Sequence, residues 1–138
     1  MSRNSVNDCG IIELPRIMGR SGNITAVEPH LNIPFEIERI YYLYDVPGGA
    51  ERGGHAHKNL RQLIVSASGS FDVILDDGID KKQITLNRPY SGLLIVPGIW
   101  RELSNFSSGA VCLVLASLRY DESDYIRDYG DFLKYVRI

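Results

Sequence analysis

Residues 61–86 read RQLIVSASGSFDVILDDGIDKKQITL and contain three short apolar runs separated by two turns. The turns are Ser68-Gly69 and Asp76-Asp77-Gly78, whose residues tolerate a positive φ. Asp-Gly between two apolar runs is a strong signal for a hairpin. The runs are rich in Val, Ile and Leu, which favour strands or a buried core. The stretch therefore predicts antiparallel β-hairpins.

Runs of the same kind recur on both sides of this stretch. The predicted strands are residues 11–14, 24–28, 38–44, 61–67, 70–75, 82–86, 93–96 and 110–117. So many short strands must close into a barrel or pack as two sheets, because an open sheet exposes its edges and one apolar face. We expect an all-β jelly-roll barrel. After Asp121, apolar residues recur every three or four positions, which predicts a short C-terminal helical segment outside the barrel.

The composition is that of one ordinary globular domain. The chain has 138 residues, 44% hydrophobic and 23% charged, so we expect a single domain over residues 1–138. The net charge is −2 and no basic block is present, which argues against a nucleic-acid partner. No apolar run is long enough for a membrane helix, and the N-terminus lacks the apolar centre of a signal peptide. We expect a cytoplasmic protein with no membrane partner.

Two of the three histidines, His55 and His57, stand two residues apart at the edge of a predicted strand. Side chains two apart on a strand point to the same face. If that face is the barrel interior, both imidazoles lie in a partly apolar cavity, where small environmental effects poise either one as an acid or a base. The alternative is a polar surface face of the strand.

These residues resemble the two sequence motifs of the cupin family. The first motif is matched by Gly49, His55, His57, Gln62 and Gly69, and the second by Gly92, Pro97, Gly98, Arg101 and Asn105. Metal-binding cupins take their ligands from the two histidines and from a Glu and a His, which are replaced here by Gln62 and Arg101. A guanidinium has no lone pair to offer and repels a dication. We therefore expect no metal and no other cofactor.

Within the cupins, the chain is most similar to the sugar-nucleotide 3,4-ketoisomerases that act on dTDP-4-keto-6-deoxyglucose. The matching segments are residues 34–45, 52–58, 75–78, 97–100 and 121–126. The resemblance implies a homodimer, a dTDP-hexose substrate and a place in making 3-amino-3,6-dideoxyhexoses for bacterial surface glycans such as O-antigen and S-layer glycan.

The implied reaction moves the ketone from C4 to C3 through an enediol and needs no redox cofactor. By similarity to the rhamnose-pathway epimerases, His55 is expected to remove the C3 proton, and His57 to shuttle the second proton, although the order can be reversed. Tyr42 and Arg101 are the candidate donors to the enolate oxygen. Since family members carry either His or Arg at the position of Arg101, the arginine favours a 3-keto-6-deoxyglucose product.

Four further residues are candidates for substrate binding. Arg39 and Arg52 suit bidentate recognition of a diphosphate. Gln62 is expected to hydrogen-bond a histidine or a sugar hydroxyl. Arg20 lies beside the position where relatives carry an arginine, but it points to the other face of an extended segment unless the chain bulges. The thymine is expected to stack on an aromatic side chain, which the sequence does not identify.

Three other interpretations remain open. A noncatalytic cupin can bind a nucleotide sugar without turnover, and a dTDP-sugar epimerase can use the same paired histidines. A metal cupin, such as a dioxygenase, would need ligands besides His55 and His57.

Overall fold

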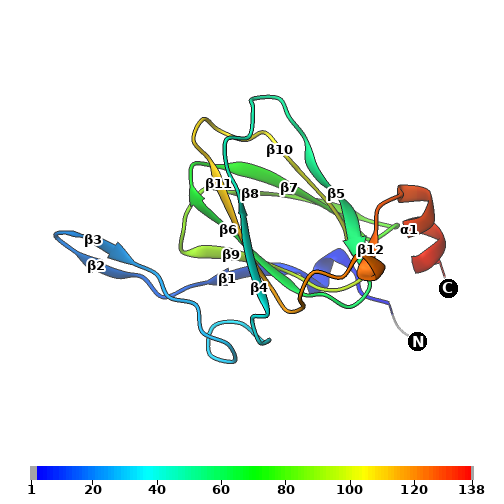
Figure 1. The fold of residues 1–138 in the computed structure, drawn as a ribbon, viewed down its shortest axis with the longest axis horizontal. Helices are drawn as coiled ribbons and strands as arrows, with labels where there is room; N and C mark the ends of the chain where they lie inside the picture. The colour runs from blue at the N-terminus through cyan, green and yellow to red at the C-terminus, as the bar shows by residue number, and fades with distance from the viewer. Residues whose placement is uncertain (1–2, 138) are drawn as a thin grey trace.

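The computed structural model of the protein describes residues 3–137 as a barrel of two antiparallel sheets (Figure 1). Each sheet has five strands, in the orders β1-β9-β6-β11-β4 and β12-β5-β10-β7-β8. The first sheet contains β1 Gly10–Glu13, β4 Arg39–Leu43, β6 Gln62–Ser68, β9 Ser91–Ile95 and β11 Val111–Ala116. The second contains β5 Arg52–His57, β7 Phe71–Asp76, β8 Lys81–Leu86, β10 Trp100–Ser104 and β12 Tyr125–Ile126. The expected all-β jelly-roll architecture is confirmed.

The other elements lie outside the two sheets. They are the hairpin β2 Ile17–Gly19 and β3 Gly22–Ile24, the 3₁₀ turns η1 Val6–Asp8 and η2 Glu122–Asp124, and the helix α1 Tyr129–Val136. The hairpin forms a separate two-stranded sheet and extends away from the barrel (Figure 1). None of the helices in the part of the chain that the structure describes is long and apolar enough to span a bilayer.

The stretch of residues 61–86 folds as predicted, into β6, β7 and β8. The β7–β8 turn places Gly78 at a φ of 91°, and Gly69 after β6 adopts 69°. A side chain at Gly69 would also meet the backbone of Ala110 at 2.8 Å, so the turn requires glycine on steric grounds as well. Across the barrel, Ile64 and Val114 of one sheet pack against Val73 of the other in the main core.

The helix α1 packs on the outer face of the second sheet. Phe132 and Val136 are buried there against Ala56 and Trp100. The position outside the barrel agrees with the prediction, but the helix begins at Tyr129, after the N-cap Asp128, and not soon after Asp121. The preceding segment instead forms η2 and the short strand β12.

Other differences from the predicted strands concern polar or glycine-rich segments. Only residue 24 of the predicted strand 24–28 is extended in a ladder, as the last residue of β3. The strands β2, β5, β10 and β12 were not among the predicted ones. In β5 and β10 the inward positions hold histidine and arginine, so the apolar alternation that marks a strand is missing.

Candidate active site

A cavity of about 320 Å³ opens inside the barrel between the two sheets, at the lower end of the usual size range for ligand pockets. Strands of both sheets and the segment around β12 contribute side chains to it. The lining residues are Arg39, Tyr41, Leu43, Arg52, His55, Gln62, Ile64, Arg101, Leu103, Val114, Tyr125 and Arg127. Polar groups therefore converge on a chamber whose remaining wall is aliphatic.

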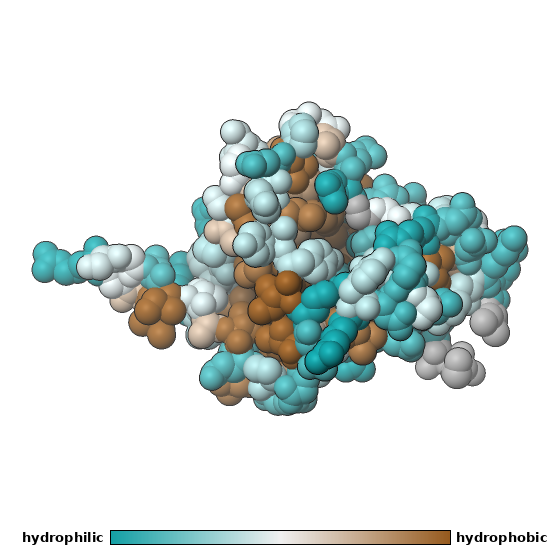
Figure 2. All heavy atoms as spheres, in the orientation of Figure 1, coloured by the Kyte–Doolittle hydropathy of each residue, from teal (hydrophilic) through white to brown (hydrophobic). Residues whose placement is uncertain are grey.

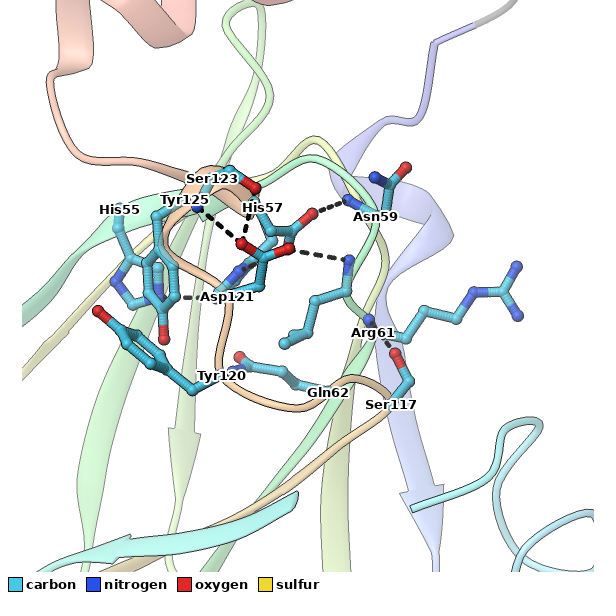
Figure 3. Close-up of polar contacts among 12 residues, drawn as sticks. His55, His57, Asn59, Arg61, Gln62, Ser117, Tyr120, Asp121, Ser123 and Tyr125 are labelled. Carbon is cyan, nitrogen blue, oxygen red and sulfur yellow. Dashed lines mark hydrogen bonds and ion pairs between the residues drawn. The ribbon is translucent and has the colours of Figure 1, made fainter. Parts of the chain in front are cut away.

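Strand β5 directs both predicted histidines to the inside. The residue between them, Ala56, packs outward against the helix α1, so His55 and His57 share the opposite face. Their Nε2 atoms lie 3.1 Å apart, within hydrogen-bond distance, and their rings are nearly perpendicular. His55 lines the cavity, and His57 lies next to it with no exposed surface. Figure 3 shows both rings packed beside Tyr125.

The buried histidine has a carboxylate partner. Nδ1 of His57 lies 3.0 Å from Oδ2 of Asp124, a residue of η2 that is itself buried. Burial, and then the nearby positive charge of Arg101, lower the pKa of His57 from its ordinary value near 6.5 to about 2. His57 is therefore neutral at physiological pH, with Asp124 as its hydrogen-bond acceptor.

Arg101 of β10 forms the second polar centre of the cavity, directly across the ladder from His55. It is 1% exposed, and no ion pair among the described residues includes it. Its Nε and Nη2 donate to the carbonyl of Ile99, and its Nη1 donates to Oε1 of Gln62 at 2.6 Å. Burial lowers the pKa of Arg101 to about 10, so the guanidinium still carries its charge at neutral pH.

Gln62 links this guanidinium to a tyrosine. Because Oε1 of Gln62 accepts from Arg101, its Nε2 is the end that donates to the hydroxyl of Tyr41, at 3.1 Å. The tyrosine oxygen accepts that bond, which leaves its own hydrogen to be donated elsewhere. Burial raises the pKa of Tyr41 above its ordinary value, so the hydroxyl stays protonated.

Tyr41 stands where Tyr42 was expected. Tyr42 is 58% exposed and does not line the cavity, because alternation along β4 sends it to the outer face of the sheet. The sequence places Tyr41 and Tyr42 on opposite faces but does not say which face is inside. The prediction that Tyr42 belongs to the site is therefore wrong, and Tyr41 lines the cavity in its place.

Arg39 and Arg52, the two candidates for diphosphate binding, both line the cavity. The Arg39 guanidinium lies over the rings of Tyr41 and Tyr120, and its Nη2 donates to the hydroxyl of Tyr125. Its buried Nε has no hydrogen-bond partner among residues 3–137. A buried donor without an acceptor is rare, which points to a ligand oxygen at this position.

Arg20 is not part of this cavity. It is exposed in the turn of the β2–β3 hairpin, which extends away from the barrel. Sequence reasoning, in turn, missed Asp124, Tyr125 and Arg127. Arg127 lines the cavity, stacks over the Tyr125 ring and forms an ion pair with Glu122. All three missed residues lie in or next to the matched segment 121–126, which was read as the start of a helix.

The donor set of the cavity does not suit a metal ion. Among residues 3–137, no three His, Cys, Asp or Glu side chains gather in an arrangement that could hold one. The cupin ligand positions of Gln62 and Arg101 are hydrogen-bonded to each other.

The comparison with protein families decides where the chain belongs. The FdtA family model, described as WxcM-like, C-terminal, matches residues 7–137. The chain belongs to the FdtA family.

Individual members of the FdtA family are similar over nearly the whole chain. TDP-4-oxo-6-deoxy-alpha-D-glucose-3,4-oxoisomerase from Aneurinibacillus thermoaerophilus is 48% identical over 91% of each chain. The solved TDP-quinovose 3,4-ketoisomerase WlaRB from Campylobacter jejuni is also 48% identical, with a TM-score of 0.88, over 92% of this chain and 98% of its own. A mutant of the 3,4-ketoisomerase QdtA from Thermoanaerobacterium thermosaccharolyticum, in complex with TDP-4-keto-6-deoxyglucose, is 39% identical with a TM-score of 0.92, over 94% of each chain.

Proposed function

We propose that this protein is a dTDP-sugar 3,4-ketoisomerase that converts dTDP-4-keto-6-deoxyglucose into the 3-keto isomer. The observation that carries the proposal is that two imidazoles, 3.1 Å apart, and the buried guanidinium of Arg101 lie at one cavity. Proton transfer next to a carbonyl needs a base and a fixed donor for the developing oxyanion, and the cavity holds both. The activities of similar FdtA family members support the same reaction.

His55 is the base that removes the proton from C3, since it lines the cavity beside Arg101. The electrons of the broken C3–H bond form the C3–C4 double bond, and the C4 ketone oxygen becomes the enolate oxygen. The C4 oxygen takes a proton from the Tyr41 hydroxyl, which gives the enediol. The C3 hydroxyl then loses its proton to His57, and C4 receives one from the protonated His55 after exchange with solvent. Transfer of the proton on His57 back to Tyr41 through solvent restores the site and completes the exchange of ketone and hydroxyl. Atoms and electrons balance within the sugar, so no external oxidant or reductant takes part.

Tyr41 and Arg101 stabilise the C4 oxygen as charge develops on it. Tyr41 accepts from Gln62, so its hydrogen is available for the substrate oxygen, and the Gln62 amide is oriented by Arg101. A fixed donor of this kind contributes about 10² to 10³ in rate. In this mechanism Gln62 orients the hydroxyl of Tyr41, which is the acid.

The diphosphate is bound by Arg39 and Arg52, with Arg127 as a third cation at the same cavity. The unpartnered Nε of Arg39 supplies one donor, and planar guanidinium groups match phosphate oxygens bidentately. Tyr120 and Tyr125, whose rings lie 5.6 Å apart next to these arginines, are the aromatic surface for the thymine.

The product is 3-keto-6-deoxyglucose, with the C4 hydroxyl in the gluco configuration. A permanently charged guanidinium at position 101 stabilises an oxyanion but does not deliver a proton to C4 as a histidine does. Reprotonation then comes from the face that carries the histidine pair. In the NMR spectrum of the product formed in ordinary water, the gluco isomer has a large H4–H5 coupling because both protons are axial, and the galacto isomer has a small one.

The active form is a homodimer of a single cupin domain over residues 1–138. Its support is the β2–β3 hairpin, because an isolated two-stranded hairpin is marginal in water. Ile17 and Ile24 face each other across the hairpin and are each 61% exposed. Figure 2 shows apolar side chains on the hairpin and near β4. A second copy that covers these side chains would stabilise the hairpin.

The reaction takes place in the cytoplasm and supplies a precursor of 3-amino-3,6-dideoxyhexoses for surface glycans such as O-antigen or S-layer glycan. Cys9 and Cys112 are buried and free, as is usual where thiols stay reduced.

Incubation with dTDP-4-keto-6-deoxyglucose in deuterated water tests the function. NMR is expected to find the ketone at C3 and deuterium at C4 of the product. Unlabelled, unchanged substrate would contradict catalysis and favour a noncatalytic nucleotide-sugar-binding cupin. A ketone still at C4, with an inverted and labelled neighbouring carbon, would indicate a dTDP-sugar epimerase.

A further inference from the structure

The carboxylate of Asp124 accepts hydrogen bonds from three groups at once. Its Oδ1 accepts from the backbone N–H of Asn59 at 2.7 Å, and its Oδ2 from that of Leu60 at 3.3 Å. The third group is Nδ1 of His57, 3.0 Å from Oδ2. The two backbone donors fix the carboxylate in place. A carboxylate that acts only as an acceptor requires the hydrogen of its histidine partner to be on Nδ1.

This requirement determines the state of the other nitrogen of His57. His57 is buried close to a guanidinium and is neutral, so it carries one ring hydrogen. With that hydrogen on Nδ1, Nε2 holds a lone pair. Nε2 is the atom that lies 3.1 Å from Nε2 of His55, and a hydrogen bond between them needs one hydrogen. In the free protein, His55 is therefore the donor and His57 the acceptor.

We propose that Asp124 is a positioning residue for the reaction, one that holds the hydrogen of neutral His57 on Nδ1 and so keeps the Nε2 lone pair facing His55 and the cavity. This inference rests on the ketoisomerase function proposed above. In that reaction His57 takes the proton of the C3 hydroxyl, and only Nε2 is turned toward the cavity side. Asp124 also balances the charge of the imidazolium that forms for a moment in a buried place.

The substitution Asp124→Asn tests this because an amide has one acceptor and one donor end. The shortest bond of Asp124 is the one from Asn59 N–H, so the amide oxygen is expected to stay there. The amide NH₂ then faces Nδ1 of His57 and donates to it, and the backbone N–H of Leu60, which makes the longest of the three bonds at 3.3 Å, loses its acceptor. The hydrogen of His57 is forced onto Nε2, and its lone pair turns away from His55 and the substrate.

The first measurement is long-range ¹H–¹⁵N NMR of the free protein labelled at histidine. In the wild type, His57 is expected as the neutral Nδ1–H form, and in Asp124→Asn as the Nε2–H form. The second measurement is steady-state kinetics. Here kcat is expected to fall by about 10²-fold or more, with KM changed less than about threefold, because the lost interaction acts on proton transfer.

Asp121→Asn is the matched control. Asp121 is in the same segment and caps η2 through the backbone N–H of Ser123, but it does not contact either histidine. It reports any effect of loosening the turn. Both its histidine tautomers and its kcat are expected to equal those of the wild type.

Several outcomes would overturn the inference. One is a wild-type His57 with its hydrogen on Nε2 or with both nitrogens protonated, a result that does not depend on whether the variant folds. Another is an Asp124→Asn protein that keeps the wild-type tautomer or the wild-type kcat. A wild type that fails to isomerise the sugar overturns the proposed function instead, and the tautomer of the free protein then decides the role of Asp124 separately.

Discussion

At the scale of single residues, two buried side chains of the site differ in charge: His57 is neutral, and Arg101 is positively charged. Burial and neighbouring positive charges keep His57 neutral, whereas Arg101 stays charged in spite of burial because its ordinary pKa is so high. Proton transfer needs this combination, since the neutral imidazole accepts a proton and the cation stabilises an oxyanion.

His55→Asn is expected to lower kcat by about 10² to 10⁴-fold, because an amide cannot act as the base at C3. Binding of the nucleotide sugar should stay nearly unchanged, since the proposed diphosphate contacts come from Arg39 and Arg52, which this variant keeps. Single-turnover kinetics and calorimetric titration with dTDP measure the two quantities. Normal turnover in this variant would place the base at another residue.

The depressed pKa of His57 predicts how stability changes with pH. Between pH 7 and pH 5 the unfolded chain binds a proton at this histidine, whose unfolded pKa is near 6.5, and the folded protein does not. The free energy of unfolding should therefore decrease when the pH is lowered from 7 to 5, by about 2 kcal/mol for this residue. The charged or titratable groups around it are His55, Asp124, Tyr125 and Arg101.

Urea unfolding at pH 7 and pH 5 measures this loss, with His57→Gln as the control. The variant lacks the titrating group, so its loss of stability between the two pH values should be smaller by about the same amount. Equal losses in both proteins would mean that the pKa of His57 is not depressed.

At the scale of elements, two of the strands that build the site, β5 and β10, lack the sequence pattern that usually predicts a strand. The hairpins of β6, β7 and β8 follow from apolar runs and glycine turns, because their inward faces fill the core. In β5 and β10, the inward positions hold His55, His57 and Arg101, so the usual pattern of a half-buried strand is absent. Histidine spacing and the cupin motifs still located the pair.

Strand β4 shows a different limit of sequence reasoning. Alternation along β4 is regular, but each face carries one tyrosine and one aliphatic residue, so hydrophobicity does not distinguish the inner face from the outer one. Only the pairing of β4 at the edge of its sheet, next to β11, turns Tyr41 toward Gln62. The site residues around Asp124 were not predicted for a similar reason, since apolar spacing in segment 121–136 fits one continuous helix.

The two neighbouring tyrosines give a matched test of this assignment. Tyr41→Phe removes the hydroxyl that accepts from Gln62 and should lower kcat by about 10² to 10³-fold. Tyr42→Phe changes an exposed ring on the outer face and should leave kcat within about twofold of wild type. Steady-state kinetics on both variants decide the assignment, and a larger loss in Tyr42→Phe would reverse it.

At the scale of the whole molecule, the barrel and the hairpin differ in what stabilises them. The barrel has its own core from two packed sheets, and the outer face of one sheet is covered by α1. The β2–β3 hairpin pairs with neither five-stranded sheet and exposes the Ile17–Ile24 pair to solvent. A two-stranded hairpin that buries so little of its own surface is marginal by itself, which supports the proposed contact with a second copy.

Replacement of both isoleucines by aspartate, Ile17→Asp with Ile24→Asp, is expected to shift the protein from dimer to monomer. Two carboxylates at the centre of an apolar contact must be desolvated, which outweighs the gain from burying the rest of the hairpin. Sedimentation velocity measures the change at micromolar protein concentration. The barrel should keep its circular dichroism spectrum, because exposed side chains remote from the core change stability by only about 0.5 kcal/mol.

The control is Ile79→Asp, which alters an isoleucine that is even more exposed, in the turn between β7 and β8. That turn lies on the sheet that carries α1, away from the hairpin, so the control should sediment as the wild type does (Figure 1). A double variant that remains dimeric would show that the hairpin is not the dimer contact. If Ile79→Asp also dissociated the protein, added charge rather than the place of the isoleucines would explain the effect.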